Sequence, residues 1–189
     1  MLIWGLAVGA GLARLNDFAN APGLADKGLC QWPRDSLIQP SRSNSTLVMF
    51  IHERCPCSQA SLAELARITA AFPDTLKVQV CVFRPGENRP VRGPSLWRDA
   101  AQIPGVTVMA DPEGREAQKF GALTSGHTFL YGKNGSLLFS GGITAGRGHS
   151  GDNFGRAVVL ALAADPQNTQ FSGTHTCVFG CPLFISSQP

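Results

Sequence analysis

Charged side chains are scarce in this 189-residue chain, and its basic residues form no cluster. Charged residues make up 15% of the sequence, and 16 Lys and Arg are scattered along it, with a formal net charge of +3. A nucleic-acid-binding surface needs basic residues gathered in a run or patch with aromatic residues among them, so nucleic acid is not a favoured partner. Internal repeats are also lacking. The apolar fraction of 43% instead suits one globular domain with appendages.

The apolar segment at the N-terminus lacks the basic residues that usually precede the apolar part of a signal peptide. Residues 1–15 read MLIWGLAVGAGLARL, with Arg14 as their one charge, and are shorter than the ~20 residues of a bilayer span. Residues 19–21, Ala-Asn-Ala, resemble a cleavage site, but Pro22 should obstruct cleavage. We expect residues 1–21 to be a signal or a membrane anchor. The protein would then be exported to the periplasm and, with the segment retained, anchored to the inner membrane; an ordinary N-terminal core helix is the alternative.

Six cysteines are present, an even number that fits disulfides in an oxidising compartment. Two of them, Cys55 and Cys57, flank Pro56. The apolar run at residues 46–51 predicts a strand buried on both faces, and residues 58–71 carry apolar side chains at helical spacing. The Cys-Pro-Cys sequence therefore lies where a strand passes into a helix, and Pro56 suits the first helical position. The other cysteines are Cys30, Cys81, Cys177 and Cys181.

A thiol at this place lies among the unpaired N–H groups of a helix N-terminus and near the positive end of the helix dipole. Both effects lower the pKa of the thiol and favour the reactive thiolate. We expect the turn to be exposed and Cys55 and Cys57 to take part in redox chemistry or in soft-metal capture. The alternative is two structural cysteines at a helix start.

The rest of the chain predicts further alternating elements. The turn at residues 132–135 contains Asn-Gly, a strong hairpin signal, and residues 85–94 are rich in proline and are expected to form a loop. The order strand, helix, strand, helix, strand, helix, hairpin, helix predicts an α/β fold with a parallel core and an antiparallel hairpin. The expected strands are 76–83, 106–110, 128–131 and 136–139, and the expected helices are 96–102, 113–120 and 153–164.

Longer stretches resemble a known superfamily. STLVMFIHERCPCSQASLAEL resembles the first strand, active-site turn and first helix of thioredoxin-like proteins, and DPEGREAQKFGALTSGHTFLYGKNGSLLFSGG resembles the later half of their TlpA-type and peroxiredoxin-type members. The phrases CPCSQASLAEL, FGALTSG, LLFSGGIT, RGHSGDN and VFGCPL together resemble RedB-like bacterial thioredoxin-fold proteins. The resemblance implies a thioredoxin-like α/β domain at residues 46–165, with a central mixed sheet flanked by helices. A hydrophobic segment and a linker at 22–45 would precede it, and a cysteine-containing tail at 166–189 would follow.

The chain departs from the thioredoxin pattern in two ways. It has Cys-x-Cys where thioredoxins have Cys-x-x-Cys, and it lacks the cis-proline that precedes their fourth strand. The place of that proline falls on Gly126 or His127. Because the cis-proline shapes the substrate groove and keeps metal from the cysteines, its absence makes metal binding more plausible here.

Several residues are candidates for the surroundings of the cysteines. In this fold the fourth strand begins beside the active-site turn, so we expect His127 to face Cys55. The glycine-rich loop at 141–151 should return to the same end of the sheet, with a flexible connection as the alternative. His52, three residues before Cys55, could support the thiolate or bind metal; the alternative is a solvent-facing histidine at the end of a strand. The candidate substrate-binding residues are His52, Gly126, His127, Thr144, Arg147 and His149.

The favoured function is an exported thiol-disulfide oxidoreductase without a dissociable cofactor. Cys55 would attack a substrate disulfide, Cys57 or Cys181 would resolve the mixed disulfide, and Pro56 would hold the turn. The substrates would be protein or small-molecule thiols and disulfides, with a thiol-disulfide redox partner. A local Cys177–Cys181 bridge is an alternative for the tail, and Cys81 is expected in the core.

Two other functions remain open. In the first, a copper-chaperone type, Cys55, Cys57 and either His127 or His52 would bind Cu(I) or another soft metal. In the second, a thiol peroxidase, Cys55 would be oxidised to a sulfenate that Cys181 resolves. The threonine and proline that peroxiredoxins place before the attacking cysteine are missing, which disfavours the peroxidase.

Overall fold

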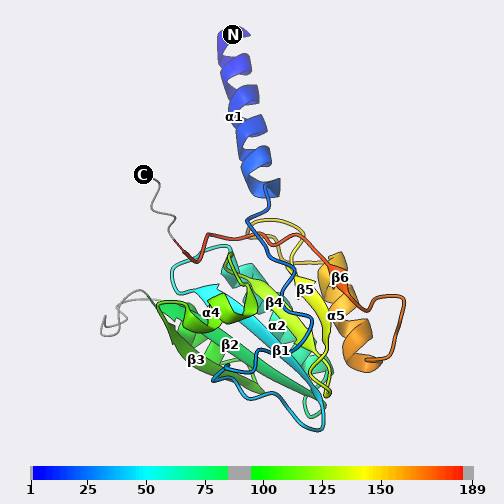
Figure 1. The fold of residues 1–189 in the computed structure, drawn as a ribbon. Helices are drawn as coiled ribbons and strands as arrows, with labels where there is room; N and C mark the ends of the chain where they lie inside the picture. The colour runs from blue at the N-terminus through cyan, green and yellow to red at the C-terminus, as the bar shows by residue number, and fades with distance from the viewer. Residues whose placement is uncertain (1, 85–94, 185–189) are drawn as a thin grey trace.

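The computed structural model describes residues 2–84 and 95–184. At its centre is a six-stranded mixed sheet with the strand order β3-β2-β1-β4-β5-β6 (Figure 1). β1 (Ser45–His52) pairs in parallel with β2 (Leu76–Arg84), which pairs in parallel with β3 (Val106–Pro112). On its other side β1 pairs antiparallel with β4 (His127–Tyr131), and β4 forms a hairpin with β5 (Leu137–Gly141).

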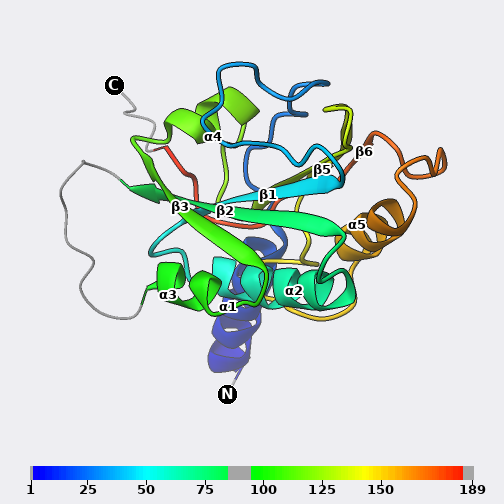
Figure 2. The same ribbon diagram turned by 90° about the horizontal axis from the view of Figure 1, so that it is seen from below.

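Helices cover both faces of this sheet (Figure 2). α2 (Ser58–Ala71), α3 (Leu96–Ala101) and α5 (Phe154–Ala164) lie on one face. α4 (Arg115–Phe120) lies on the other face, beside the chain that leads into β1. The sheet is thus the middle layer of three, and its central strand β1 is buried from both sides.

The alternation of side chains along β1 builds the two halves of the core. Met49 points to one face and packs in a cluster with Leu65 of α2, whereas Phe50 points to the other and packs with Phe120 of α4. Successive residues of a strand face opposite sides, so an uninterrupted apolar run serves both layers at once. The apolar run of β1 thereby fixes the strand that ends at the cysteines in the centre of the molecule.

The predicted thioredoxin-like α/β fold is confirmed. Each strand and helix predicted between residues 46 and 165 is present, with ends that differ by no more than two residues, and the Asn-Gly turn joins β4 to β5. The predicted loop at 85–94 lies outside the described residues. One strand was not predicted: β6 (Thr174–His175) adds to β5 from within the polar tail. A two-residue strand has too short a pattern to be found by its periodicity.

The first helix, α1 (Leu2–Asn20), stands away from the domain (Figure 1). Its apolar side chains are exposed; Trp4, for example, is 72% exposed and Leu12 is 62% exposed. The alternative of an N-terminal core helix is therefore wrong. Among the residues described, no helix combines the length and the apolar character needed to cross a membrane.

Candidate active site

Three cysteine sulfurs meet at the end of the sheet where β1 passes into α2. The Sγ atoms of Cys55, Cys57 and Cys181 all lie within 4.8 Å of one another. We call these three residues the sulfur cluster. Two come from the Cys-Pro-Cys turn and the third from the C-terminal tail. The structure thus brings together the three cysteines that the sequence selects as redox partners.

The turn that carries the first two sulfurs is held by its own backbone. The N–H of Cys55 donates to the carbonyl of His52 at 3.0 Å, and the N–H of Ser58 donates to the carbonyl of Cys55 at 3.1 Å. The first residue of α2 is Ser58, with Cys57 as its N-cap. Pro56 therefore lies in the turn before the helix and not at the first helical position, which corrects the expectation from the sequence.

The tail reaches the site by pairing with the chain just before β4. The N–H of Ser125 donates to the carbonyl of Cys181 at 2.8 Å, and the N–H of Leu183 donates to the carbonyl of Leu123 at 2.9 Å. Gly180 makes this approach feasible, because a Cβ at that position would lie 1.9 Å from the Ser125 carbonyl oxygen. The pairing directs the backbone N–H of Cys181 at Sγ of Cys55, at 3.4 Å.

This covering segment overturns the expectation that the whole turn is exposed. Cys55 is buried, with 1% of its surface exposed, whereas Cys57 and Cys181 are partly exposed. The sequence places Cys55 at the end of a strand, which is correct, but it does not show that a tail more than a hundred residues away lies over it. The accessible sulfurs of the cluster are those of Cys57 and Cys181.

The environment separates the three thiols by acidity. Burial raises the pKa of Cys55, but hydrogen bonds from Ser58 and Cys181 outweigh burial and bring the pKa to about 7. Burial and the neighbouring Cys55 raise the pKa of Cys57. Burial, followed by the hydrogen bond to Cys55 and its charge, raises the pKa of Cys181 to about 12. Cys55 is therefore the thiol of the cluster that ionises near neutral pH, whereas Cys57 and Cys181 stay protonated there.

The hydroxyls of Ser58 and Ser125 orient the hydrogen bond that Ser58 donates to the thiolate of Cys55. The Oγ atoms of Ser58 and Ser125 lie 2.7 Å apart, and Ser125 also accepts the backbone N–H of His52 at 2.6 Å. When the Ser125 hydroxyl donates to Oγ of Ser58, the Ser58 hydroxyl proton is free to donate to Sγ of Cys55. Ser58 is a site residue that the sequence analysis missed; its only signal was its place at the start of α2, directly after Cys57.

Arg147, from the glycine-rich loop, lies beside the cluster as expected. Its charge partly opposes the rise in the pKa values of Cys57 and Cys181. Its guanidinium also donates to the carbonyls of Gly180 and Ala21, and it lies over the ring of Phe18 at 4.9 Å from the ring centroid. Arg147 therefore joins the tail, the end of α1 and the sulfur cluster.

His127, which was expected to face Cys55, does not. His127 is fully buried, its ring stacks on Phe129 at 4.2 Å, and its Nε2 lies 3.0 Å from the Ser140 hydroxyl. The alternation along β4 sends residues 127, 129 and 131 to the α4 face, opposite α2. Burial lowers the pKa of His127 to about 3, so the imidazole is neutral. The metal-ligand set Cys55, Cys57 and His127 is therefore wrong.

His52 is also directed elsewhere. Its Nδ1 accepts the backbone N–H of Arg54 at 3.1 Å, and its ring stacks against Phe83. Burial and, after it, the nearby Arg54 lower the pKa of His52. Nδ1 of His52 thus holds the turn, and the residue is not part of the sulfur cluster.

The other candidate substrate-binding residues, Gly126, Thr144 and His149, make contacts with the protein itself or lie in the glycine-rich loop. Gly126 has φ +94°, its N–H donates to the carbonyl of Phe50 at 2.7 Å, and a Cβ there would lie 2.9 Å from the Ser61 hydroxyl. Thr144 is buried in the glycine-rich loop. His149 is exposed, and its Nδ1 lies 2.9 Å from the carbonyl of Arg147, away from the sulfurs. Cys177 is exposed and lies outside the cluster, and Cys81 is buried in the core as expected.

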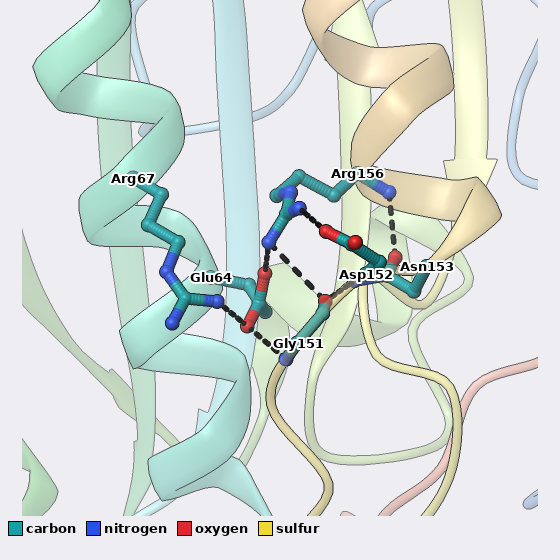
Figure 3. A network of polar contacts seen from close by, with 6 residues as sticks. All are labelled: Glu64, Arg67, Gly151, Asp152, Asn153 and Arg156. Atoms are coloured by element: carbon teal, nitrogen blue, oxygen red, sulfur yellow. Dashed lines mark hydrogen bonds and ion pairs between the residues drawn. The ribbon is translucent and has the colours of Figure 1, made fainter.

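A buried ion-pair network fastens the glycine-rich loop to α2 (Figure 3). Glu64 is fully buried and accepts hydrogen bonds from Arg67 at 2.6 Å, from the N–H of Gly151 at 2.8 Å and from Arg156 of α5. Arg156 also pairs with Asp152 at 2.8 Å. Because Arg147 belongs to the same loop, the network helps to hold it beside the sulfurs. The sequence analysis missed this role of Glu64.

Comparisons with solved structures support the fold. The chain is similar to a hypothetical protein from Sinorhizobium meliloti, with a TM-score of 0.66 and 18% identity over 87% of this chain and 98% of the other. It is also similar to an uncharacterized conserved protein from Geobacillus kaustophilus, with a TM-score of 0.60 and 13% identity over 90% and 95% of the two chains. No protein-family model and no curated protein matches. The fold is therefore thioredoxin-like, and it carries a centre of three cysteine sulfurs.

Replacing Ser58 by alanine should raise the pKa of Cys55, because the thiolate loses a donor. A hydrogen bond to a charged group is worth about 1.5–3 kcal/mol, and 1.36 kcal/mol corresponds to one pH unit, so we expect a rise of about one to two pH units. The measurement is a titration of the thiolate absorbance in the ultraviolet. Ser61→Ala, a buried serine on the same helix, is the control and should leave the titration unchanged. An unaltered midpoint in Ser58→Ala would contradict the assignment.

Replacing Glu64 by glutamine should destabilise the fold, because Arg156 would lose its buried counter-charge. Breaking a buried ion pair costs about 3–5 kcal/mol. The free energy of unfolding, measured by denaturant titration, should fall by about that amount. Arg67→Gln is the matched control: the Arg67 side chain is 54% exposed, and an exposed pair contributes up to about 1 kcal/mol. Equal losses in the two variants would show that the network has no special role.

Proposed function

We propose that this protein is a thiol-disulfide oxidoreductase that works through the sulfur cluster. The observation that carries the proposal is the meeting of three thiols within 4.8 Å, one of them with a pKa of about 7, at the strand-to-helix turn of a thioredoxin-like fold. Sulfurs at this separation need only small side-chain rotations to reach bonding distance. A thiolate at neutral pH is the species that thiol-disulfide exchange requires.

The burial of Cys55 supports the role of an internal sulfur for it, in place of the attack on the substrate that the sequence led us to expect. In the oxidised protein, Cys55 and Cys181 form a disulfide, and a substrate thiolate attacks the partly exposed Sγ of Cys181. The S–S bond breaks, the bonding pair stays on Cys55, and its thiolate is stabilised by Ser58. A thiolate of low pKa is the better leaving group. Cys55 has a lower pKa than Cys181, so attack at Cys181 with Cys55 leaving is the favourable direction. In the reverse direction the Cys55 thiolate resolves the mixed disulfide on Cys181.

The second thiol of a dithiol substrate completes the reaction by attacking the mixed disulfide at the substrate's own sulfur. The substrate then leaves as a disulfide, and Cys181 is released and takes up a proton. The substrate loses two electrons and the protein gains them, so a thiol-disulfide partner must reoxidise the cluster. Cys181 is preferred to Cys57 as the bonded partner because a Cys55–Cys57 bridge would close a very small ring across Pro56, whose φ is fixed.

Export and the RedB-like assignment belong to the same proposal. The exposed, apolar α1 adds nothing to the core of the domain, which supports a segment used for export or for attachment to a membrane. The periplasm is an oxidising compartment in which such a disulfide persists. Protein or small-molecule thiols and disulfides are the expected substrates, and the phrases shared with RedB-like proteins agree with this reading.

The proposal is tested by oxidation of a reduced peptide dithiol with copper-free, oxidised protein, followed by mass-spectrometric mapping of the disulfide. We expect a Cys55–Cys181 bridge and stoichiometric oxidation of the peptide. Cys55→Ser and Cys181→Ser should reduce oxidation to background, whereas Cys57→Ser should retain most of it. Cys177→Ser, which removes an exposed thiol outside the cluster, is the control. Full activity in Cys55→Ser, or a Cys177–Cys181 bridge as the only disulfide, would refute the proposal.

A further inference from the structure

We propose that, in the fully reduced protein, the three sulfurs of Cys55, Cys57 and Cys181 bind one Cu(I) ion in a three-coordinate thiolate site. This goes beyond disulfide exchange and replaces the histidine-containing ligand set expected from the sequence. Within residues 2–84 and 95–184, the sulfur cluster is the group of metal-ligating side chains whose ligand atoms lie close enough to share one ion. The site includes Cys181 of the tail, which the sequence offers as a redox partner of Cys55 but not as a metal ligand.

The geometry suits a small ion at the centre of the three sulfurs. A metal–sulfur bond of about 2.3 Å in a trigonal arrangement places the sulfurs about 4 Å apart. The three Sγ atoms already lie within 4.8 Å of one another, so each pair must approach by less than about 1 Å. Rotation of the partly exposed Cys57 and Cys181 side chains supplies this adjustment without moving β1 or α2.

The ligand set favours a soft monovalent ion. Thiolates are soft ligands that suit Cu(I), zinc and iron–sulfur clusters. A structural zinc site needs four ligands, and among the described residues the group of neighbouring ligand atoms holds these three sulfurs and no histidine nitrogen. His127 lies on the other face of the sheet. Three thiolates without a fourth protein ligand fit three-coordinate Cu(I).

Positive charge beside the sulfur cluster lowers the electrostatic free energy of holding three thiolates close together. Three thiolates and Cu(I) carry a net charge of −2, and Arg147 and the N-terminus of the 14-residue α2 both lie beside them. The Cys181 N–H and the Ser58 hydroxyl are donors to sulfur in the second layer. Such outer donors orient metal ligands and typically change affinity by about 10–100-fold when removed. The burial of Cys55 also keeps water from one side of the ion.

Metal binding and disulfide formation exclude each other, because any disulfide within the cluster removes two of the three ligands. The redox state of the cluster therefore decides whether copper is bound. Exchange with a disulfide partner, which takes up two electrons as the S–S bond forms in the cluster, would release the ion, and exchange with a dithiol, which returns the two electrons, would restore the site. This coupling needs no movement of the sheet, only the making or breaking of one S–S bond.

The test is anaerobic competition for Cu(I) between the fully reduced protein and a coloured Cu(I) chelator. We expect one ion per chain, and a loss of affinity of at least about 10–100-fold in each of Cys55→Ser, Cys57→Ser and Cys181→Ser. His127→Ala and Cys177→Ser are the controls and should bind as the unaltered chain does. X-ray absorption of the copper-loaded unaltered protein should show three sulfur neighbours, a result that does not depend on how any variant folds.

The outcomes separate this proposal from the preceding one. No stoichiometric copper, loss of binding in His127→Ala, or unchanged binding in Cys181→Ser would overturn the copper site. Tighter binding of Zn(II) than of Cu(I) by the same reduced protein would overturn the choice of ion. Because peptide oxidation is measured with copper-free protein, a failed copper site leaves that assay intact, and a failed oxidation assay leaves the copper titration intact.

Discussion

The hydrogen bonding between the C-terminal segment and the chain before β4 is the constraint on which the site depends. It places the carbonyl of Cys181 on the N–H of Ser125 and directs the N–H of Cys181 at Cys55. One segment thereby supplies the third sulfur, a donor to the thiolate and the cover that buries it. Without this pairing the Cys-Pro-Cys turn would be two exposed thiols at a helix start.

The chemistry of the site follows from two opposing effects on the pKa of Cys55, which burial raises and hydrogen bonds lower. Burial disfavours a charged sulfur, but the donors Ser58 and Cys181 more than compensate, so the buried Cys55 is still the most acidic thiol of the three. Acidity and accessibility are thus divided between different residues. The same division suits an internal leaving group in disulfide exchange and a shielded ligand for a soft metal ion.

The glycine-rich loop is the second support of the site. Glu64 joins α2 to Gly151 and to Arg156 of α5, and the loop between these contacts carries Arg147 to the tail and the sulfurs (Figure 3). A buried carboxylate of this kind is stable only with its counter-charges in place. The network therefore links the stability of the domain to the position of the cation beside the cluster.

The sequence by itself determined the strands and helices between residues 46 and 165 and the place of Cys55 and Cys57 at a strand-to-helix turn, because apolar periodicity and turn residues are local properties. It also shows that His127 shares a strand face with Phe129, yet not that this face is turned away from α2. Only the tertiary structure decided that Cys55 is buried, that Ser58 and Glu64 support the site and that Cys181 completes it. These features arise from contacts between segments separated by 126 residues in the case of Cys55 and Cys181. Such contacts are chosen by the packing of the whole domain, which no local pattern encodes.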